Sequence, residues 1–414
     1  MIVNCNIEEN HLNEVFPSHD FLRTFAVLFK ISLKKEMKKL ILPLFAVAIT
    51  LNACKKDNKE VELVGTEPEV TCNTGSYCFL RDGNTTVDYA GQTARLNQLE
   101  ELTTYMKSGN TPNTVLDLDV LNDMFSNADG AGSIHFSADA AASGKQLENK
   151  CFLGTIDSYY DYFLAIEIAS MSITAGSNGV AGVVTSTVNS SKQYLLDENG
   201  FEHIQLIEKG LMGDVFYFQA TDTYLVGTEN GNYDNVAIAD AAAGKHYTEA
   251  EHKFDEAFGY FGVSSDFPTN TEGVRFHGKY CNARDAALGT NAIMDAFIGC
   301  RTAITANTDV APFTAALRTE WHRTIAGTAI SYLKLAKENI NDPAIKCHEL
   351  SEAYAFIGNL LHNTPELALT PAQVQEARDL MGSNFYDTTE DELDATISFL
   401  IDNTLIEFID LISL

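Results

Sequence analysis

Histidine and carboxylate side chains at helical spacing are the pattern in this chain closest to a metal site. His252 and Glu256 are four residues apart, and Glu249 precedes His252 by three. Residues three and four apart share one helix face, and imidazole with carboxylates suits a hard or borderline metal ion. His348 and Glu352 repeat the spacing. Both sets lie opposite the apolar residues of their own predicted helices, so we interpret them as solvated faces unless a second bundle covers them.

A second group of polar residues falls within the apolar faces of predicted helices. Burying a charge without a partner is costly, so such residues are either paired or functional. One hypothesis is structural, with Arg301 paired to Asp214 and Arg95 paired to a carboxylate. The other is a polar site between bundles that holds a metal ion or a small polar ligand. The candidates for that site are His203, Asp214, His322, Asp157 and Asp161.

No catalytic motif accompanies these residues. The sequence has no Gly-x-Ser-x-Gly elbow, no His-Glu-x-x-His helix and no phosphate loop. We therefore expect a protein that binds rather than an enzyme. A hydrolase would need a deep pocket that joins His203 or His322 to a carboxylate.

The net charge limits the kinds of partner that this protein can bind. The chain of 414 residues has 28 Lys and Arg against 57 Asp and Glu, a net charge of −29. Binding to the nucleic-acid backbone requires clustered cations, so no nucleic-acid partner is expected. Adhesion to anionic lipid through a basic face is disfavoured for the same reason.

The N-terminal region carries an export signal. Within residues 37–54, two lysines precede an apolar run, and small residues precede Cys54. The run is too short for a comfortable membrane span. The alternative is a chance apolar stretch, but charge, run and cysteine occur in the order of a secretory signal.

The end of this signal, Leu51 to Cys54, resembles the bacterial lipobox. The resemblance implies that Cys54 is lipidated and becomes the mature N-terminus, anchored in the outer membrane or at the cell surface. Stable anchoring needs two or more acyl chains and no transmembrane helix. We expect an upstream extension over 1–36, a signal peptide over 37–53, a tether over 54–64 and a folded domain over 65–414.

Six cysteines follow Cys54, and an exported protein meets an oxidising space in which disulfides are permitted. Cys72 and Cys78 flank a turn-like loop and form the most plausible local pair. Six cysteines allow 15 pairings, so the rest of the connectivity stays open.

The elements that must position these residues are helices. From about residue 90 onward, apolar residues recur at three and four, and Gly, Asn and Asp clusters interrupt long runs without Pro. This predicts an all-α fold of packed helical bundles. A weak divide at 227–245 suggests two halves, 65–230 and 245–414. The predicted helices are 91–107, 113–126, 152–188, 200–225, 246–262, 279–306, 312–340, 343–362, 371–382 and 389–413.

Three stretches carry a family resemblance: Tyr89–Leu102, Glu251–Gly262 and Asp266–Pro268. Together they resemble a Bacteroidetes lipoprotein family catalogued as domain-of-unknown-function family 4856. The resemblance covers most of residues 65–414. It implies a secreted, lipid-anchored and largely helical protein, and it brings no established chemistry.

A more distant resemblance is to imelysin-type envelope proteins, which have two helical bundles and are linked to iron uptake. Their signature is Gly-x-His-x-x-Glu, and the candidate match is Gly210–Val215. Met212 stands in place of the His and Val215 in place of the Glu, so the resemblance supports the fold without the metal pair.

Two functions follow. The leading hypothesis is a lipid-anchored, all-α envelope protein that binds a metal ion or a metal-containing ligand in iron acquisition. The alternative is a structural or protein-interaction lipoprotein of an outer-membrane complex, which predicts paired buried polar groups and no remaining pocket.

Overall fold

The computed structural model describes residues 71–128, 132–407, 409–410 and 414. The predictions for the extension, the signal peptide, Cys54 and the tether lie outside the described residues. The described residues form one compact unit.

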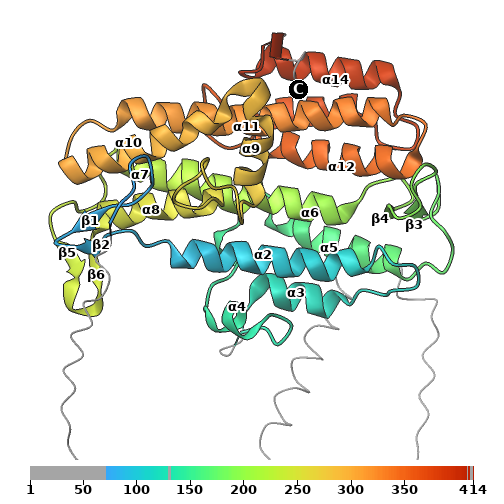
Figure 1. The fold of residues 1–414 in the computed structure, drawn as a ribbon. Coiled ribbons are helices and arrows are strands. Elements are labelled where there is room, and N and C mark those ends of the chain that lie inside the picture. The colour runs from blue at the N-terminus through green and yellow to red at the C-terminus, as the bar shows by residue number, and fades with distance from the viewer. Residues whose placement is uncertain (1–70, 129–131, 408, 411–413) are drawn as a thin grey trace, which may run out of the picture. The chain divides into compact units, whose positions relative to one another are not determined.

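Helices dominate this unit, which confirms the predicted all-α class (Figure 1). They are α2 (Ala90–Ser108), α3 (Leu118–Ser126), α4 (Ala138–Ala142), α5 (Ile156–Ser170), α6 (His203–Leu211), α7 (Val226–Glu229), α8 (Glu249–Phe261), α9 (Phe276–Leu288), α10 (Ile293–Ala306), α11 (Ala311–Glu338), α12 (Pro343–Asn359), α13 (Pro371–Leu380) and α14 (Glu390–Asn403). Several of them, including α2, α11, α12 and α13, lie close to their predicted ranges. Two π-helical segments, Met212–Tyr217 and Gln219–Leu225, connect α6 to α7.

Three antiparallel hairpins interrupt the helices. They pair β1 (Leu80–Arg81) with β2 (Asn84–Thr85), β3 (Gly182–Thr185) with β4 (Gln193–Leu196), and β5 (Ile238–Asp240) with β6 (Lys245–Thr248). The predicted helix 152–188 is therefore wrong beyond Ser170. Its second half is rich in glycine and ends in a β-branched run, a composition that favours a hairpin over a helix.

The helices pack in layers, as Figure 1 shows. The longest, α11, lies against α9, α10, α12 and α14, and α6 packs on α12 and α5. On the other side of this core, α2 packs on α6 and α8. These contacts cross the divide expected at 227–245, so the two predicted halves share one core instead of forming separate bundles.

Local signals explain where the helices begin and end. A capping box joins Thr248 to Glu251 at the start of α8, and another joins Thr389 to Glu392 at the start of α14. The single helix predicted over 279–306 is two helices. Gly289 adopts the left-handed conformation, with φ of 67°, and ends α9 before α10 begins.

Carbonyl groups where α6 passes into the π-helical segment accept hydrogen bonds from side chains of other helices. Asn359 Nδ2 donates to the carbonyl oxygen of Lys209 at 3.0 Å, and His277 Nε2 lies 2.9 Å from the carbonyl oxygen of Met212. A Cβ atom at Gly213 would lie 1.9 Å from Asn359 Oδ1. A Cβ atom at position 213 would collide with Asn359, so the wide turn requires glycine there. The two hydrogen bonds hold α9 and α12 against the segment.

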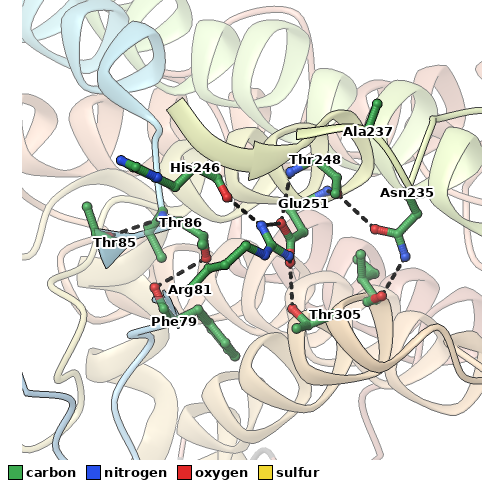
Figure 2. Close-up of polar contacts among 12 residues, drawn as sticks. Phe79, Arg81, Thr85, Thr86, Asn235, Ala237, His246, Thr248, Glu251 and Thr305 are labelled. Carbon is green, nitrogen blue, oxygen red and sulfur yellow. Dashed lines mark hydrogen bonds and ion pairs between the residues drawn. The ribbon is translucent and has the colours of Figure 1, made fainter. Parts of the chain in front are cut away.

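A buried ion-pair cluster joins the first hairpin to α8 and α10. Arg301 is fully buried; its Nε lies 2.9 Å from Asp255 Oδ1 and its Nη1 lies 3.0 Å from Glu251 Oε1. Arg81 Nη1 reaches the other oxygen of Glu251 at 2.9 Å. Figure 2 shows Arg81 and Thr305 meeting Glu251 from different sides.

The partners of the two buried arginines differ from those expected. Arg301 pairs with Glu251 and Asp255, so the predicted pair with Asp214 is wrong. Arg95 donates from Nε to the carbonyl oxygen of Gln146 at 2.8 Å, and it forms no ion pair with a carboxylate among the described residues. The carbonyl oxygen of Gln146 replaces the expected carboxylate, because the turn over residues 146–149 covers the guanidinium group of Arg95.

The charge on Glu251 is secured by its neighbours. Burial alone would raise the pKa of Glu251, but its bonds to Arg81 and the nearby Arg301 outweigh burial and lower the pKa to about 2. The stabilisation that this carboxylate provides is present above its unfolded pKa near 4.5 and is lost as the pH falls toward 2.

A disulfide joins Cys72 to Cys78, the local pair expected from the sequence, with an S–S distance of 2.02 Å. Cys151, Cys281, Cys300 and Cys347 are buried thiols. In the part of the chain that the structure describes, no helix combines the length and the apolar character needed to cross a bilayer.

Replacing Arg301 tests how much the fold depends on the cluster. We expect Arg301→Met to lower the free energy of unfolding by about 3–5 kcal/mol, because it strands buried carboxylates without their counter-charge. The control is Arg323→Met on α11, whose part-exposed pair with Glu320 (3.1 Å) should contribute about 0–1 kcal/mol. Urea unfolding at pH 7 measures both. Equal losses in the two variants would contradict the assigned role of Arg301.

Candidate functional site

The residues predicted for a metal site do not meet. His203 Nε2 lies 3.0 Å from Asp197 Oδ2, a partner six residues away. His322 is fully buried in α11, and neither ring nitrogen has a hydrogen-bond partner among the described residues. Burial lowers the pKa of His322 to about 4, so its ring is neutral at pH 7.

Asp157 and Asp161 are exposed on α5. The expectation that they lie in an apolar face is wrong, because α5 turns Tyr159, Phe163 and Ile166 toward the core instead. Among the described residues, no group of three or more His, Cys, Asp or Glu side chains is placed to hold a metal ion.

The metal-site candidates on α8, which are His252, Glu256 and Glu249, make local contacts instead. His252 Nδ1 lies 3.0 Å from the carbonyl oxygen of Asp88, its ring stacks on Tyr247, and its Nε2 lies 3.8 Å from Glu256 Oε1. Glu249 is exposed and accepts a bond from the Asp234 amide at 3.2 Å. These three side chains therefore form no shared pocket.

His348 and Glu352, which the sequence analysis placed on a solvated face, are instead largely covered. His348 Nδ1 lies 2.6 Å from Glu202 Oε2, and Tyr194 stacks on the imidazole ring at 4.1 Å. The prediction failed because α6 and β4 pack on this face of α12.

Asp214 is the centre of a buried hydrogen-bond network on the π-helical segment. Its Oδ2 accepts from Thr155 Oγ1 and from the Tyr159 hydroxyl, both at 2.6 Å. Its Oδ1 lies 2.7 Å from Nε2 of His362, a residue that sequence reasoning did not single out. All of these groups are paired, so Asp214 fastens α5 and the end of α12 to the segment.

A small cavity adjoins this network. Asp214, Tyr162 and Arg378 are among the residues that line it, and its volume is about 90 Å³. At roughly 30 Å³ for each water, it has room for a few water molecules. It is too small for an organic ligand of ordinary size.

A larger pocket lies where α2, α6 and the amino end of α9 meet. Its volume is about 340 Å³, within the range of roughly 300–1,000 Å³ typical of ligand sites. The helices α2 and α6 lie side by side there (Figure 1). We call it the cationic pocket and define it by its charged lining, which comprises Lys107, Lys209, Arg275, Lys279, Glu100 and Glu208.

The lining has more positive than negative groups. Four cations face two carboxylates. A third carboxylate, Glu352, contacts Lys209 at 3.3 Å from outside the lining. Even with Glu352 counted, the balance of four against three is positive, in a chain whose net charge is −29.

Glu208 holds two lysines of the pocket in place. Lys107 Nζ lies 2.8 Å from one oxygen of Glu208, and Lys209 Nζ lies 3.0 Å from the other. Burial would lower the pKa of Lys209, but Glu208 and Glu352 raise it above its usual value. Burial would likewise raise the pKa of Glu208, but Lys209 and Lys107 lower it to about 2. Lys209 and Glu208 are therefore charged at pH 7.

The other charged residues of the lining are Glu100, Arg275 and Lys279. Arg275 Nη1 lies 3.1 Å from Glu100 Oε2 and 2.6 Å from Asn97 Oδ1. Lys279 is exposed and forms no ion pair with any described residue. The ammonium groups of Lys209 and Lys279 lie 5.5 and 6.0 Å from the centroid of the Tyr280 ring. An anion in the pocket thus meets one cation without a described ion-pair partner, Lys279, and three cations that carboxylates hold in place.

The chemistry of the lining is that of anion binding. Ammonium and guanidinium groups recognise oxyanions by charge-assisted hydrogen bonds. The lining contains no His, Cys or Ser. Spacing in the sequence gave no indication of this site, because its lysines belong to helices about a hundred residues apart.

Fold and pocket together define an all-α protein with one core and a cation-lined pocket. The chain belongs to the family described as a domain of unknown function (DUF4856), whose model matches residues 74–401. No curated protein matches the chain. No solved structure matches it either.

The role assigned to Asp214 can be tested by a conservative substitution. We expect Asp214→Asn to lower the free energy of unfolding by about 2 kcal/mol, because it removes the charge opposite His362 and one acceptor for Tyr159 and Thr155. The same change at exposed Asp157 should alter it by less than about 0.5 kcal/mol. Urea unfolding distinguishes them, and an Asp214→Asn variant as stable as Asp157→Asn would show that the network is not structural.

Proposed function

We propose that this is a lipid-anchored protein of the bacterial cell envelope that binds a small anionic ligand in the cationic pocket and does not transform it. The observation that carries the proposal is the excess of cations around a pocket of about 340 Å³ in a chain of net charge −29. An acidic surface repels anions from most of the molecule, so a locally positive pocket selects where an anion binds.

The lipid anchor is the second part of the proposal. It rests on the sequence from Met37 to Cys54, where a charged start, an apolar run and a lipobox-like end occur in order. An acylated Cys54 would place the domain in the outer membrane or at the cell surface. We also propose that the chain comes from a member of the Bacteroidetes.

A metal-containing ligand is compatible with this function only if the metal is part of an anionic complex. The pocket offers ammonium and guanidinium groups, which repel a bare metal ion, so a metal would enter only within an anionic complex. Met212, which stands at the His position of the imelysin signature, is part of the lining. An imelysin-like role in iron acquisition would therefore use this pocket without direct ligands from the protein.

A role as a structural or protein-interaction lipoprotein is the second candidate. The pairing of the buried charges around Arg301 and Asp214 agrees with it. So do the exposed apolar side chains of Ile168, Met171 and Ile173 near the end of α5, which are 59%, 53% and 89% exposed. The open cationic pocket favours ligand binding instead.

Anion binding is tested by titrating the purified protein with inorganic phosphate and with citrate at low ionic strength. We expect at least one of them to bind, and Lys279→Glu to weaken that binding about tenfold, because it reverses the unpaired charge at the mouth of the pocket. Lys245→Glu on β6 makes the same charge change away from the lining and should have little effect. No binding of either anion, or equal losses in both variants, would refute the proposal.

Lipid anchoring is tested separately in a host with lipoprotein-processing enzymes. We expect the wild type to partition into the detergent phase of a Triton X-114 extract. Cys54→Ser should move to the aqueous phase, because it removes the thiol that accepts the lipid. If both proteins partition alike, the anchor is not at Cys54.

A further inference from the structure

We infer that the ligand of the cationic pocket is a phosphate monoester, with its phosphate group at the amino end of α9 and its organic group against Tyr280 and Phe276. This inference rests on the proposed function, because it names the ligand of the same pocket. Five features of the pocket support it.

The amino end of α9 is open toward the pocket. Arg275 is the N-cap residue of this helix of 13 residues, its side chain makes no capping hydrogen bond, and the first turn contains no acidic residue. Arg275 and Phe276 both line the pocket. The free N–H groups and the positive end of the helix dipole favour an anion at such a position, and phosphate is its frequent occupant.

The backbone at this helix start is also strained. Phe276 has a φ of 50°, in the left-handed region that a bulky residue rarely adopts. Gly262 accepts the Arg275 amide at 2.9 Å and fixes the chain just before this residue. Strain of this kind concentrates at binding sites, where the conformation of the backbone is part of the recognition.

A buried hydroxyl points to the same kind of ligand. Thr103 of α2 lines the pocket and is only 5% exposed, yet its Oγ1 has no hydrogen-bond partner among the described residues. A buried polar atom without a partner is costly. An anionic oxygen in the pocket would accept a bond from this hydroxyl.

The cations are distributed over three helices. Lys107 comes from α2, Lys209 from α6, and Arg275 with Lys279 from the start of α9. A phosphate group offers three acceptor oxygens that point in different directions and a charge of about −1.5 to −2 at pH 7. A carboxylate offers two oxygens in one plane. Donors that come from three helices therefore match a phosphate group better than a carboxylate.

The remaining space is suited to an organic group. The volume of about 340 Å³ is far larger than one ordered water. Phe276, Tyr280 and Met212 provide an apolar and aromatic wall. Glu100, whose side chain is 63% exposed, lies on the lining and would accept a hydroxyl group of the ligand. A bare inorganic phosphate would fill only part of this volume.

The test compares two dianions that carry the same ring. Phenyl phosphate and phthalate are titrated into the purified protein by isothermal calorimetry at low ionic strength, with inorganic phosphate as a third probe. We expect phenyl phosphate to bind at least tenfold more tightly than phthalate and than inorganic phosphate.

The outcomes separate this inference from the proposed function. Phthalate binding as tightly as phenyl phosphate would overturn the phosphate assignment and leave anion binding standing. Inorganic phosphate binding as tightly as phenyl phosphate would overturn the organic part of the assignment. If none of the three probes binds, the inference fails, and failure of citrate as well removes the proposed function.

A variant locates the phosphate. Thr103→Val keeps the shape of the side chain and removes the hydroxyl, so it should weaken phenyl phosphate binding about tenfold. Thr302→Val is the matched control, because the Thr302 hydroxyl is exposed on α10 and bonds only its own helix at 2.7 Å. Unchanged affinity in Thr103→Val would place the phosphate elsewhere in the pocket.

Discussion

A charge that is taken out of water must be paired, and this constraint governs how the described helices pack. Arg301 has no exposed surface, and it fixes α10 to α8 through Glu251 and Asp255. Arg81 shares Glu251 and thereby fastens the first hairpin to the same helix. Lys209 plays the corresponding part between α6 and α12, because Glu352 lies across from it at 3.3 Å. Each cluster is formed by residues distant in sequence, so neither is complete until the fold is.

The same requirement applies to backbone groups, and it accounts for the π-helical segment after α6. A wide turn releases carbonyl oxygens from the helical ladder, and each needs a donor from elsewhere. Asn359 and His277 supply two of these donors, and His362 pairs with the neighbouring carboxylate of Asp214. The segment therefore depends on α9 and α12 for its geometry. Its first residue, Met212, lines the cationic pocket, so those contacts also shape the proposed ligand site.

The pocket combines fixed and free charge. Lys107 and Lys209 are held in place by Glu208, while Lys279 at the mouth has no described carboxylate partner. Preorganised cations lose little freedom when a ligand binds, and a free cation gives the ligand a favourable interaction that no protein group already makes. Together with the open end of α9, this arrangement offers an anion several hydrogen-bond donors at once.

The sequence by itself determined the helices and much of their ends, because apolar periodicity and capping residues act within a few positions. Thus α2, α11 and α13 lie close to their predicted ranges, and the loop between Cys72 and Cys78 indicated the disulfide that the structure contains. A helical wheel also identified Arg301 and His322 as buried. It gives the direction of a side chain relative to its own helix, but not which helix lies opposite. Only the tertiary structure decided that Arg301 meets Asp255, that Asp214 meets His362, and that lysines from α2 and α6 share one carboxylate, because those pairings depend on how distant helices pack.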